Sequence, residues 1–385
     1  MGNILRNQKT RGILFQAVAL SVVAVALIGM VINAKSTLDA QGLTSGFSFL
    51  ERSTGWDFSF SVLPYEISDT YTRVILIGVL NTLLLGFLGL SLATLFGIII
   101  GLVRTSKNYL FSLLGTVYVE TFRNIPLILQ AVFWYAILTH LPRPRQAINI
   151  ADSIFISGRG FYFPVLNIPL WSFVIMVVMF IGWLITLGWL RKKMDASLAY
   201  HRLKKQGWFV LLIAIFIVGY LARIPETSLL DVPALKGLNF QGGMRMPPEL
   251  TALVVAIALY GGAYIGEVVR AGLMAVPKGQ IEAAYVSGLS NFQIFWHIRM
   301  PLAFRAVLPS LTNQYVQLMK ATTIGIVVGF SDLFMIISTS INQSGQTLEL
   351  LAILMGCFLV INLSIAYVMN TIDRKIALKG YEVKS

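Results

Sequence analysis

The sequence predicts an all-α, polytopic membrane protein with about eight transmembrane helices. Of its 385 residues, 56% are hydrophobic and only 12% are charged, and a water-soluble fold cannot bury that much apolar side chain. The apolar residues gather into segments that reach the roughly 20 residues needed to cross a bilayer. These segments lack the alternating pattern of barrel strands, so we expect helices. The composition excludes a cytosolic enzyme and a disordered protein.

Eight such segments follow one another along the chain. They cover residues 13–32, 74–103, 113–140, 170–190, 207–222, 249–272, 304–330 and 347–371. The first has a basic flank like a signal peptide, but its apolar run is too long and no cleavage site follows, so we interpret it as an uncleaved anchor. The connecting segments, including 331–346, are expected to be loops, and none is large enough for a separate soluble domain.

The charge distribution predicts the orientation of these segments. With the N-terminus inside, the cytoplasmic segments and their edges hold 19 Lys and Arg, and the outer loops hold 9. The net charge is then +15 inside and −2 outside, which follows the positive-inside rule and places both termini in the cytoplasm. This division of charge across the membrane lipid therefore explains the total charge of +13 without nucleic acid. The run Arg191-Lys192-Lys193 is interpreted as a stop-transfer anchor or a lipid-headgroup site.

The motifs of an enzyme are missing from this sequence. The dipeptide Gly-Lys does not occur, so the chain has no P-loop for nucleotide phosphates. It contains one cysteine, Cys357, and three scattered histidines, which form no metal-ligand or nucleophile–base pattern. We expect no catalytic residue, no metal and no cofactor in this chain.

The segment 276–301 contains the strongest local signal. Residues 280–287 read as a short helix with one apolar face, and Gly288 suits a left-handed C-terminal cap. Ser290 and Gln293 form a capping box that opens a second helix, and Pro301 follows the end of that helix. Such a cytoplasmic hairpin either presses into the groove of a partner protein or lies on lipid headgroups.

A resemblance favours the first alternative. The hairpin matches the pattern EAA-x3-G-x9-I-x-L-P of permease subunits of bacterial ABC importers, with Met300 in place of the usual Leu. The matching residues are Glu282, Ala283, Ala284, Gly288, Ile298 and Pro301. The resemblance implies that the first short helix is the coupling helix, which docks on a separate ATPase subunit that binds ATP and Mg²⁺.

Further segments resemble the polar amino acid branch of these permeases, the His/Glu/Gln/Arg/opine family. They are Gly78-Val79-Leu80-Asn81-Thr82-Leu83, Tyr118-Val119-Glu120-Thr121-Phe122-Arg123-Asn124-Ile125-Pro126-Leu127, Tyr264-Ile265-Gly266-Glu267-Val268-Val269-Arg270-Ala271-Gly272 and Leu318-Met319-Lys320-Ala321-Thr322-Thr323. Ala321 stands where this family frequently has Asp. The segment 156–162 and the additional spans resemble the larger permease subunits of general L-amino acid importers.

The resemblance implies a type I importer core of five helices with three additional ones. The regions are then 1–73 (anchor and periplasmic loop), 74–140 (core), 141–248 (periplasmic loop and extra hairpin) and 249–385 (core with the coupling hairpin). It also implies import of L-amino acids across the bacterial inner membrane from a periplasmic binding protein. A second permease subunit is expected as partner, and the extra spans favour a related chain over a copy.

Polar residues inside the apolar segments are candidates for the substrate pathway, because ionisable groups are costly in hydrocarbon. Glu120 and Arg123, beside Asn124, are spaced to pair on one helix. They form a structural ion pair, or Arg123 recognises the carboxylate of the amino acid. In the seventh segment a polar stripe lines a pathway or joins helices; its residues are Asn313, Gln314, Gln317 and Lys320.

Two other patterns inside the spans read as structural. Glu267 and Arg270 are spaced for an ion pair near the cytoplasmic end. Three Gly-x3-Gly pairs, at 97 and 101, 262 and 266, and 325 and 329, allow helices to approach closely.

Two rival functions remain open at this point. An ion-coupled secondary transporter acting without an ATPase predicts inverted repeats, and we find no repeat. A membrane scaffold or sensor would bind partners without substrate flux. Which amino acids would be carried does not follow from the sequence.

Overall fold

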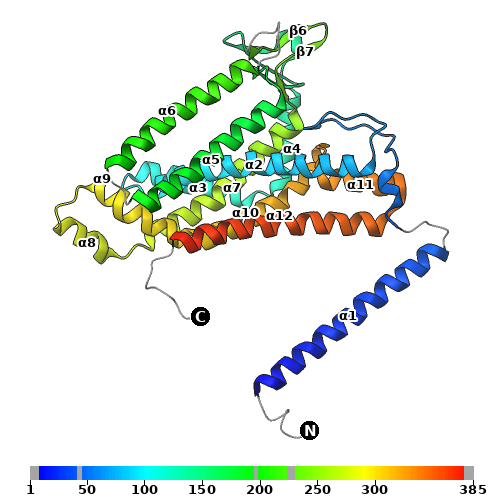
Figure 1. Cartoon of the computed structure of the whole chain (residues 1–385), viewed down its shortest axis with the longest axis horizontal. Helices are drawn as coiled ribbons and strands as arrows, with labels where there is room; N and C mark the ends of the chain where they lie inside the picture. Colours follow the sequence, from blue (N-terminus) through cyan, green and yellow to red (C-terminus); the bar gives the residue numbers. More distant parts are fainter. Residues whose placement is uncertain (1–7, 41–45, 195–197, 223–229, 377–385) are drawn as a thin grey trace. The chain divides into compact units, whose positions relative to one another are not determined.

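The computed structural model describes residues 8–40, 46–194, 198–222 and 230–376 (Figure 1). The chain divides into two compact units. The first comprises Met1–Val132 and Leu253–Ser385, and the second comprises Phe133–Ala252. The first unit therefore holds most of the segments that resemble the importer core, and the second holds most of the extra region.

Helices account for most of the described residues. The α-helices are α1 (Gln8–Ala40), α2 (Tyr71–Arg104), α3 (Tyr109–Asn124), α4 (Leu127–Thr139), α5 (Leu170–Met194), α6 (Leu198–Leu221), α7 (Pro248–Met274), α8 (Lys278–Val286), α9 (Asn291–Ile294), α10 (Met300–Ala321), α11 (Leu333–Ser344) and α12 (Thr347–Ile376). Short 3-10 turns are η1 (Ser48–Glu51), η2 (Pro144–Gln146) and η4 (Thr322–Val328), and η3 (Phe295–Arg299) is a π-turn.

The described residues confirm a polytopic helical membrane protein. Five helices are long and apolar enough to cross a bilayer, and each of two bent pairs adds a span if it crosses as one. These five are α2, α7 and α12 with the apolar parts of α1 and α6, Arg11–Met30 and Arg202–Leu221. A shorter apolar stretch, Ile175–Leu190, lies in α5. About eight apolar helical segments are thus present, as the sequence predicts.

The third predicted span, 113–140, is a bent pair and not one continuous helix. The axes of α3 and α4 differ by 101° across the break at Ile125 and Pro126. Proline lacks the N–H of a helical bond and disfavours helical geometry in the preceding residue, and Ile125 is extended, with ψ 123°. The buried Gln130 amide donates to the carbonyls of Phe122 (3.0 Å) and Ile125 (2.9 Å), so it satisfies groups that the break frees.

The prediction of a loop over 331–346 is wrong, because α11 occupies most of it. Asp332 is the N-cap, and its carboxylate accepts the Met335 N–H at 2.8 Å. Gly345, with φ +71°, ends the helix in a left-handed cap. One face of α11 is buried against α2, where Leu333 comes close to Gly78. This packing outweighs the polar composition of the segment.

Short strands add to the helices in the second unit. One antiparallel sheet has the order β1-β2-β3-β8, and two small ribbons pair β4 with β5 and β6 with β7. Their bounds are β1 Ile148–Ile150, β2 Ile154–Ser157, β3 Gly160–Phe163, β4 Val165–Leu166, β5 Leu230–Asp231, β6 Ala234–Lys236, β7 Asn239–Gln241 and β8 Met244–Met246. The strands on the two sides of the α5–α6 hairpin thus join in one small subdomain.

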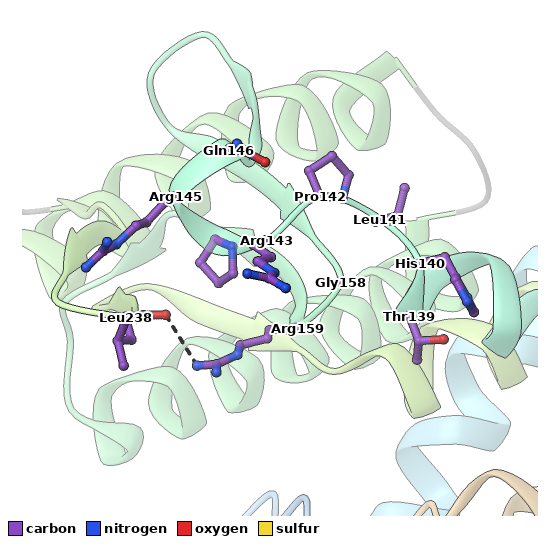
Figure 2. A pocket seen from close by; sticks show the side chains of 11 residues that line it. Thr139, His140, Leu141, Pro142, Arg143, Arg145, Gln146, Gly158, Arg159 and Leu238 are labelled. Atoms are coloured by element: carbon purple, nitrogen blue, oxygen red, sulfur yellow. Dashed lines mark hydrogen bonds between the residues drawn. The ribbon is translucent and has the colours of Figure 1, made fainter.

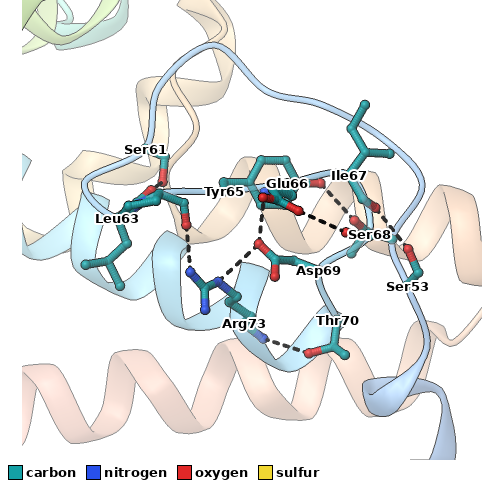
Figure 3. Close-up of polar contacts among 12 residues, drawn as sticks. Ser53, Ser61, Leu63, Tyr65, Glu66, Ile67, Ser68, Asp69, Thr70 and Arg73 are labelled. Atoms are coloured by element: carbon teal, nitrogen blue, oxygen red, sulfur yellow. Dashed lines mark hydrogen bonds and ion pairs between the residues drawn. The ribbon is translucent and has the colours of Figure 1, made fainter.

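The loop 46–70 before α2 is ordered by its own polar contacts (Figure 3). The Arg73 guanidinium donates to the Pro64 carbonyl at 2.8 Å and pairs with the Asp69 carboxylate at 3.1 Å. The same carboxylate accepts the Glu66 N–H at 2.9 Å. The first turn of α2 therefore holds the loop in a fixed shape.

Glycines let α2 and α7 pack closely within the first unit. A Cβ at Gly97 would lie 2.5 Å from Ile265 Cγ2, and one at Gly101 would lie 2.5 Å from Val269 Cγ1. Gly262 and Gly266 of α7 face α2 in turn, so two predicted Gly-x3-Gly pairs pack helices. The third pair differs, because Gly329 has φ +76° and open space around it, so it serves a turn.

We expect Gly97→Ala to lower the free energy of unfolding by roughly 1–3 kcal/mol, because Ile265 is fully buried and overpacking strains such a contact. Gly356→Ala in α12 is the matched control, since nothing lies within 4 Å of its Cβ position. The measurement is the melting temperature of the purified protein. Equal melting temperatures for the two variants would contradict the close α2–α7 contact.

Candidate functional site: the α8–α9 hairpin and the α3–α4 break

The hairpin predicted from the sequence is present as α8 and α9. α8 runs from Lys278 to Val286, and Gly288 follows it in the left-handed conformation, with φ +75°. The Leu289 N–H reaches back to the Ala284 carbonyl at 3.2 Å, a bond typical of glycine-terminated helices. Ser290 caps α9, and its capping box with Gln293 is formed in both directions. Two short helices are therefore held by a tight, specified turn.

One side of the hairpin anchors it and the other is free. Ala284 is buried, and Ile281 packs against the apolar cluster of Leu273, Val276 and Ala303. On the free side large apolar side chains are exposed, among them Val286 (90%) and Phe292 (71%). The predicted apolar face is thus divided, since Ile281 and Ala284 turn inward while Tyr285 is exposed.

Four residues of the motif are exposed. They are Glu282, Ala283, Gly288 and Pro301, while Ile298 is half-buried. The predicted helix end before Pro301 is absent, because α9 continues through the π-turn η3 into α10. Pro301 lies in the first turn of α10, where proline needs no backbone donor. The hairpin is therefore joined directly to α10.

Arg123 lies at the α3–α4 break, and its predicted pair with Glu120 does not form. Its guanidinium carbon lies 5.0 Å from the ring centroid of Tyr264 in α7, a cation–π contact. Glu120 and Asn124 are exposed, and none of the ion pairs among the described residues includes Arg123 or Glu120. The Arg123 Nε is buried without a hydrogen-bond partner. The side chain is thus positioned by an aromatic face while its hydrogen-bonding capacity stays unused.

The polar stripe on α10 points away from the rest of its own unit. Asn313, Gln317 and Lys320 are exposed, and Gln314 is half-buried. In the described part of the chain, α3 and α10 share no hydrogen bond or ion pair, so the structure does not join this stripe to Arg123. An exposed stripe on a membrane helix needs a partner helix or a watery path.

Similarity to known proteins decides the family. Residues 206–378 match the family model described as binding-protein-dependent transport system inner membrane component. The chain is 39% identical to YhdX of Escherichia coli (strain K12), provisionally named an amino-acid ABC transporter permease, over 97% of this chain and 95% of YhdX. The chain belongs to this permease family.

Two other relatives are aligned over nearly their full length. The general L-amino acid transport system permease AapQ of Rhizobium johnstonii is 33% identical, over 96% of this chain and 93% of AapQ. The glutamate/glutamine/aspartate/asparagine transport system permease BztB of Rhodobacter capsulatus is 32% identical, over 98% of this chain and 96% of BztB. The full-length alignments show that the additional region belongs to the permease, which is a multi-pass inner-membrane protein.

An ion cluster ties the C-terminal ends of two permease helices together. The Glu267 carboxylate in α7 accepts from Arg270 at 2.5 and 3.1 Å, which confirms the predicted pair. Arg104, the last residue of α2, pairs with the same carboxylate. One carboxylate therefore bridges two arginines and joins α2 to α7.

Asn81 and Thr82 are key residues whose roles the sequence did not reveal. Both are fully buried in α2. Asn81 donates to the carbonyls of Phe60 (3.0 Å) and Ser331 (2.7 Å), and Thr82 accepts the Leu333 N–H at 2.9 Å. They fix the loop 46–70 and the start of α11 to α2. The only signal for these residues in the sequence was their position in the segment 78–83, which resembles the permease family.

The described residues of the permease contain no group of three or more His, Cys, Asp or Glu side chains that could hold a metal ion.

Proposed function

We propose that this chain is the permease subunit of an ATP-driven importer that moves L-amino acids from a periplasmic binding protein into the cytoplasm. The observation that carries the proposal is the exposed hairpin α8–α9 in a chain whose aligned relatives are named as amino-acid permeases. The hairpin presents apolar side chains and Glu282 outward, with a shape fixed by Gly288 and Ser290. Such a surface suits the groove of an ATPase subunit.

In this proposal the partner ATPases bind ATP and Mg²⁺, and this chain holds no cofactor. When the ATPases close, they push on α8, and the motion passes through η3 into α10, because the backbone is continuous there. Loaded binding protein and ATP then favour different states of the same bundle, which moves substrate. The excess of basic residues on the hairpin side supports cytoplasmic termini.

A second permease subunit would cover the exposed stripe on α10. Lys320 and its polar neighbours cannot face lipid cheaply, whereas a facing permease would enclose them in a pathway between the two chains. The extra helices α1, α5 and α6 support a related chain as the partner rather than a second copy.

Gentle purification of the chain from its native membrane tests the function. We expect a P-loop ATPase and a related permease to co-purify, and the ATPase activity to rise with binding protein loaded with single amino acids. A chain that emerges alone, without ATPase, and that transports in response to an ion gradient would favour a secondary transporter.

Arg123 is the residue that we propose for contact with the amino acid carboxylate. We expect Arg123→Ala to lower uptake roughly tenfold or more, since a hydrogen bond to a charged group contributes about 1.5–3 kcal/mol, while the complex still assembles. Arg123→Lys keeps the charge without the planar fork and should be intermediate. The measurement is uptake by reconstituted transporter; unchanged uptake in the alanine variant would return Arg123 to a structural role.

A further inference from the structure

The second unit contains a large basic pocket that the transport mechanism above does not use. It has a volume of about 850 Å³ and lies between the end of α4, the η2 turn and the loop at Gly158 (Figure 2). Arg143, Arg145 and Arg159 line it together with His140. By the predicted orientation this region is periplasmic.

The arginines of this pocket have no acidic partner. No carboxylate lines the pocket, and the ion pairs among the described residues do not include these side chains. Two carboxylates of the same unit are engaged elsewhere, since Asp152 accepts from the Asn149 amide at 2.5 Å and Asp231 accepts the Gly243 N–H at 2.8 Å. Among the described residues of this unit, no carboxylate therefore pairs with the positive charge of the pocket.

The backbone builds the pocket around Arg159. The Gly158 N–H donates to the Pro142 carbonyl at 2.9 Å, and a Cβ at Gly158 would lie 2.8 Å from the carbonyl oxygens of Thr139 and Leu141. Gly160 has φ +133°, and a Cβ there would lie 2.6 Å from the Met246 oxygen. Only glycine meets both conditions, so this frame is specified by the sequence.

The side chain of Arg159 is also held at its edge of the pocket. Its guanidinium donates to the Leu238 carbonyl at 3.3 Å, and its own carbonyl accepts from Arg245 at 3.1 Å. The bond to Leu238 uses only one of the several N–H donors of the Arg159 guanidinium. The remaining donors are available to a ligand. The sequence Gly158-Arg159-Gly160 thus holds the Arg159 side chain at the edge of the pocket that Arg143 and Arg145 also line.

Carboxylates are the ligands that arginine pairs with best in two-pronged geometry. A free amino acid would be a poor occupant, since small-ligand sites bury most of their ligand, whereas all three arginines here are exposed on an open rim. An acidic protein surface can cover several such side chains at once. Opposite charges across an interface mainly raise the association rate.

We propose that this pocket receives an acidic surface loop of the periplasmic binding protein, whose Asp or Glu side chains pair with Arg143, Arg145 and Arg159. The inference rests on the proposed function, because it names a docking point for the partner of that function. The pocket then guides the loaded binding protein to the transporter before the substrate is released.

The test uses the complete transporter in nanodiscs of zwitterionic lipid, so that the lipid headgroups carry no net negative charge. Association of its binding protein is followed by surface plasmon resonance at low and physiological salt. The double variant Arg143→Glu/Arg145→Glu should associate roughly tenfold more slowly and lose most of its salt dependence. Arg159→Gln should show a smaller change in the same direction.

Lys236→Glu is the control for a single charge reversal. It makes the same kind of charge reversal on β6 of the same unit, at an exposed position that does not line the pocket. Its association rate should stay within about twofold of the unaltered protein. Equal melting temperatures of the variants exclude a folding defect as the cause.

Two results would overturn the proposal, and they are distinguishable. If the double variant associates as fast as the control, with the same salt dependence, the pocket is not the docking point although the importer function stands. If the unaltered transporter does not bind any binding protein and its ATPase does not respond to one, the proposed function fails and the docking role falls with it.

Discussion

Replacing Gly288 with valine is expected to lower amino acid uptake by at least about tenfold while ATP hydrolysis continues. Gly288 adopts φ +75° at the turn between α8 and α9. A β-branched residue avoids this conformation, and holding a non-glycine residue there costs on the order of 1–3 kcal/mol. Valine therefore favours a different turn, which in the proposed function changes the angle at which the hairpin α8–α9 would meet the ATPase.

Strain, and not a clash within the chain, is the cause of this expected loss. Nothing lies within 4 Å of a Cβ at Gly288. Gly288→Asn is the matched control, because asparagine is similar in bulk but tolerates the left-handed region. We expect it to retain most of its uptake. The measurement compares uptake with ATPase activity in reconstituted transporter; normal coupling in the valine variant would remove the hairpin from the transport cycle.

Local signals in the sequence sufficed to predict the hairpin. A capping box needs only Ser290 and Gln293, and a left-handed cap needs only Gly288, so tertiary contacts were not required. The long spans were predictable for a similar reason, since α2, α7 and α12 each carry enough apolar residues to cross a bilayer alone.

Contacts between distant residues could not be predicted. The spacing of three residues predicts that Arg123 pairs with Glu120. In the structure its guanidinium instead contacts the ring of Tyr264, which is far away in the sequence. The strand β3 pairs with β8 across the whole α5–α6 hairpin, as in Phe161 opposite Met246. Strands of two to four residues leave no periodic signal, so their partners decide whether they form.

The missed helix α11 shows how burial outweighs composition. Its 12 residues are too short for a span and include Ser, Thr, Asn and Gln, so the segment looks like a loop. Asp332 at the N-cap and Gly345 at the C-cap were readable signals. The deciding contribution comes from α2, whose buried polar side chains fix the start of α11.

Replacing Asn81 with leucine is therefore expected to give the largest loss of stability. Leucine is apolar and of comparable size, so it fills the space but leaves the carbonyls of Phe60 and Ser331 and the N–H of Val62 without their partner. Each unsatisfied buried polar group costs about 1–3 kcal/mol. The free energy of unfolding should fall by roughly 3 kcal/mol or more.

The same substitution at an exposed position of α11, Asn342→Leu, isolates this effect. It exchanges the same side chains without breaking any of the Asn81 contacts, so the change in stability should stay within roughly 0.5 kcal/mol. Melting temperature and protease resistance of the purified complex measure both variants. If Asn81→Leu has the same melting temperature as the control, the loop 46–70 and α11 do not depend on Asn81 of α2 for their placement. A lowered melting temperature with early cleavage in 46–70 would instead show that one buried amide holds this loop and α11 to α2.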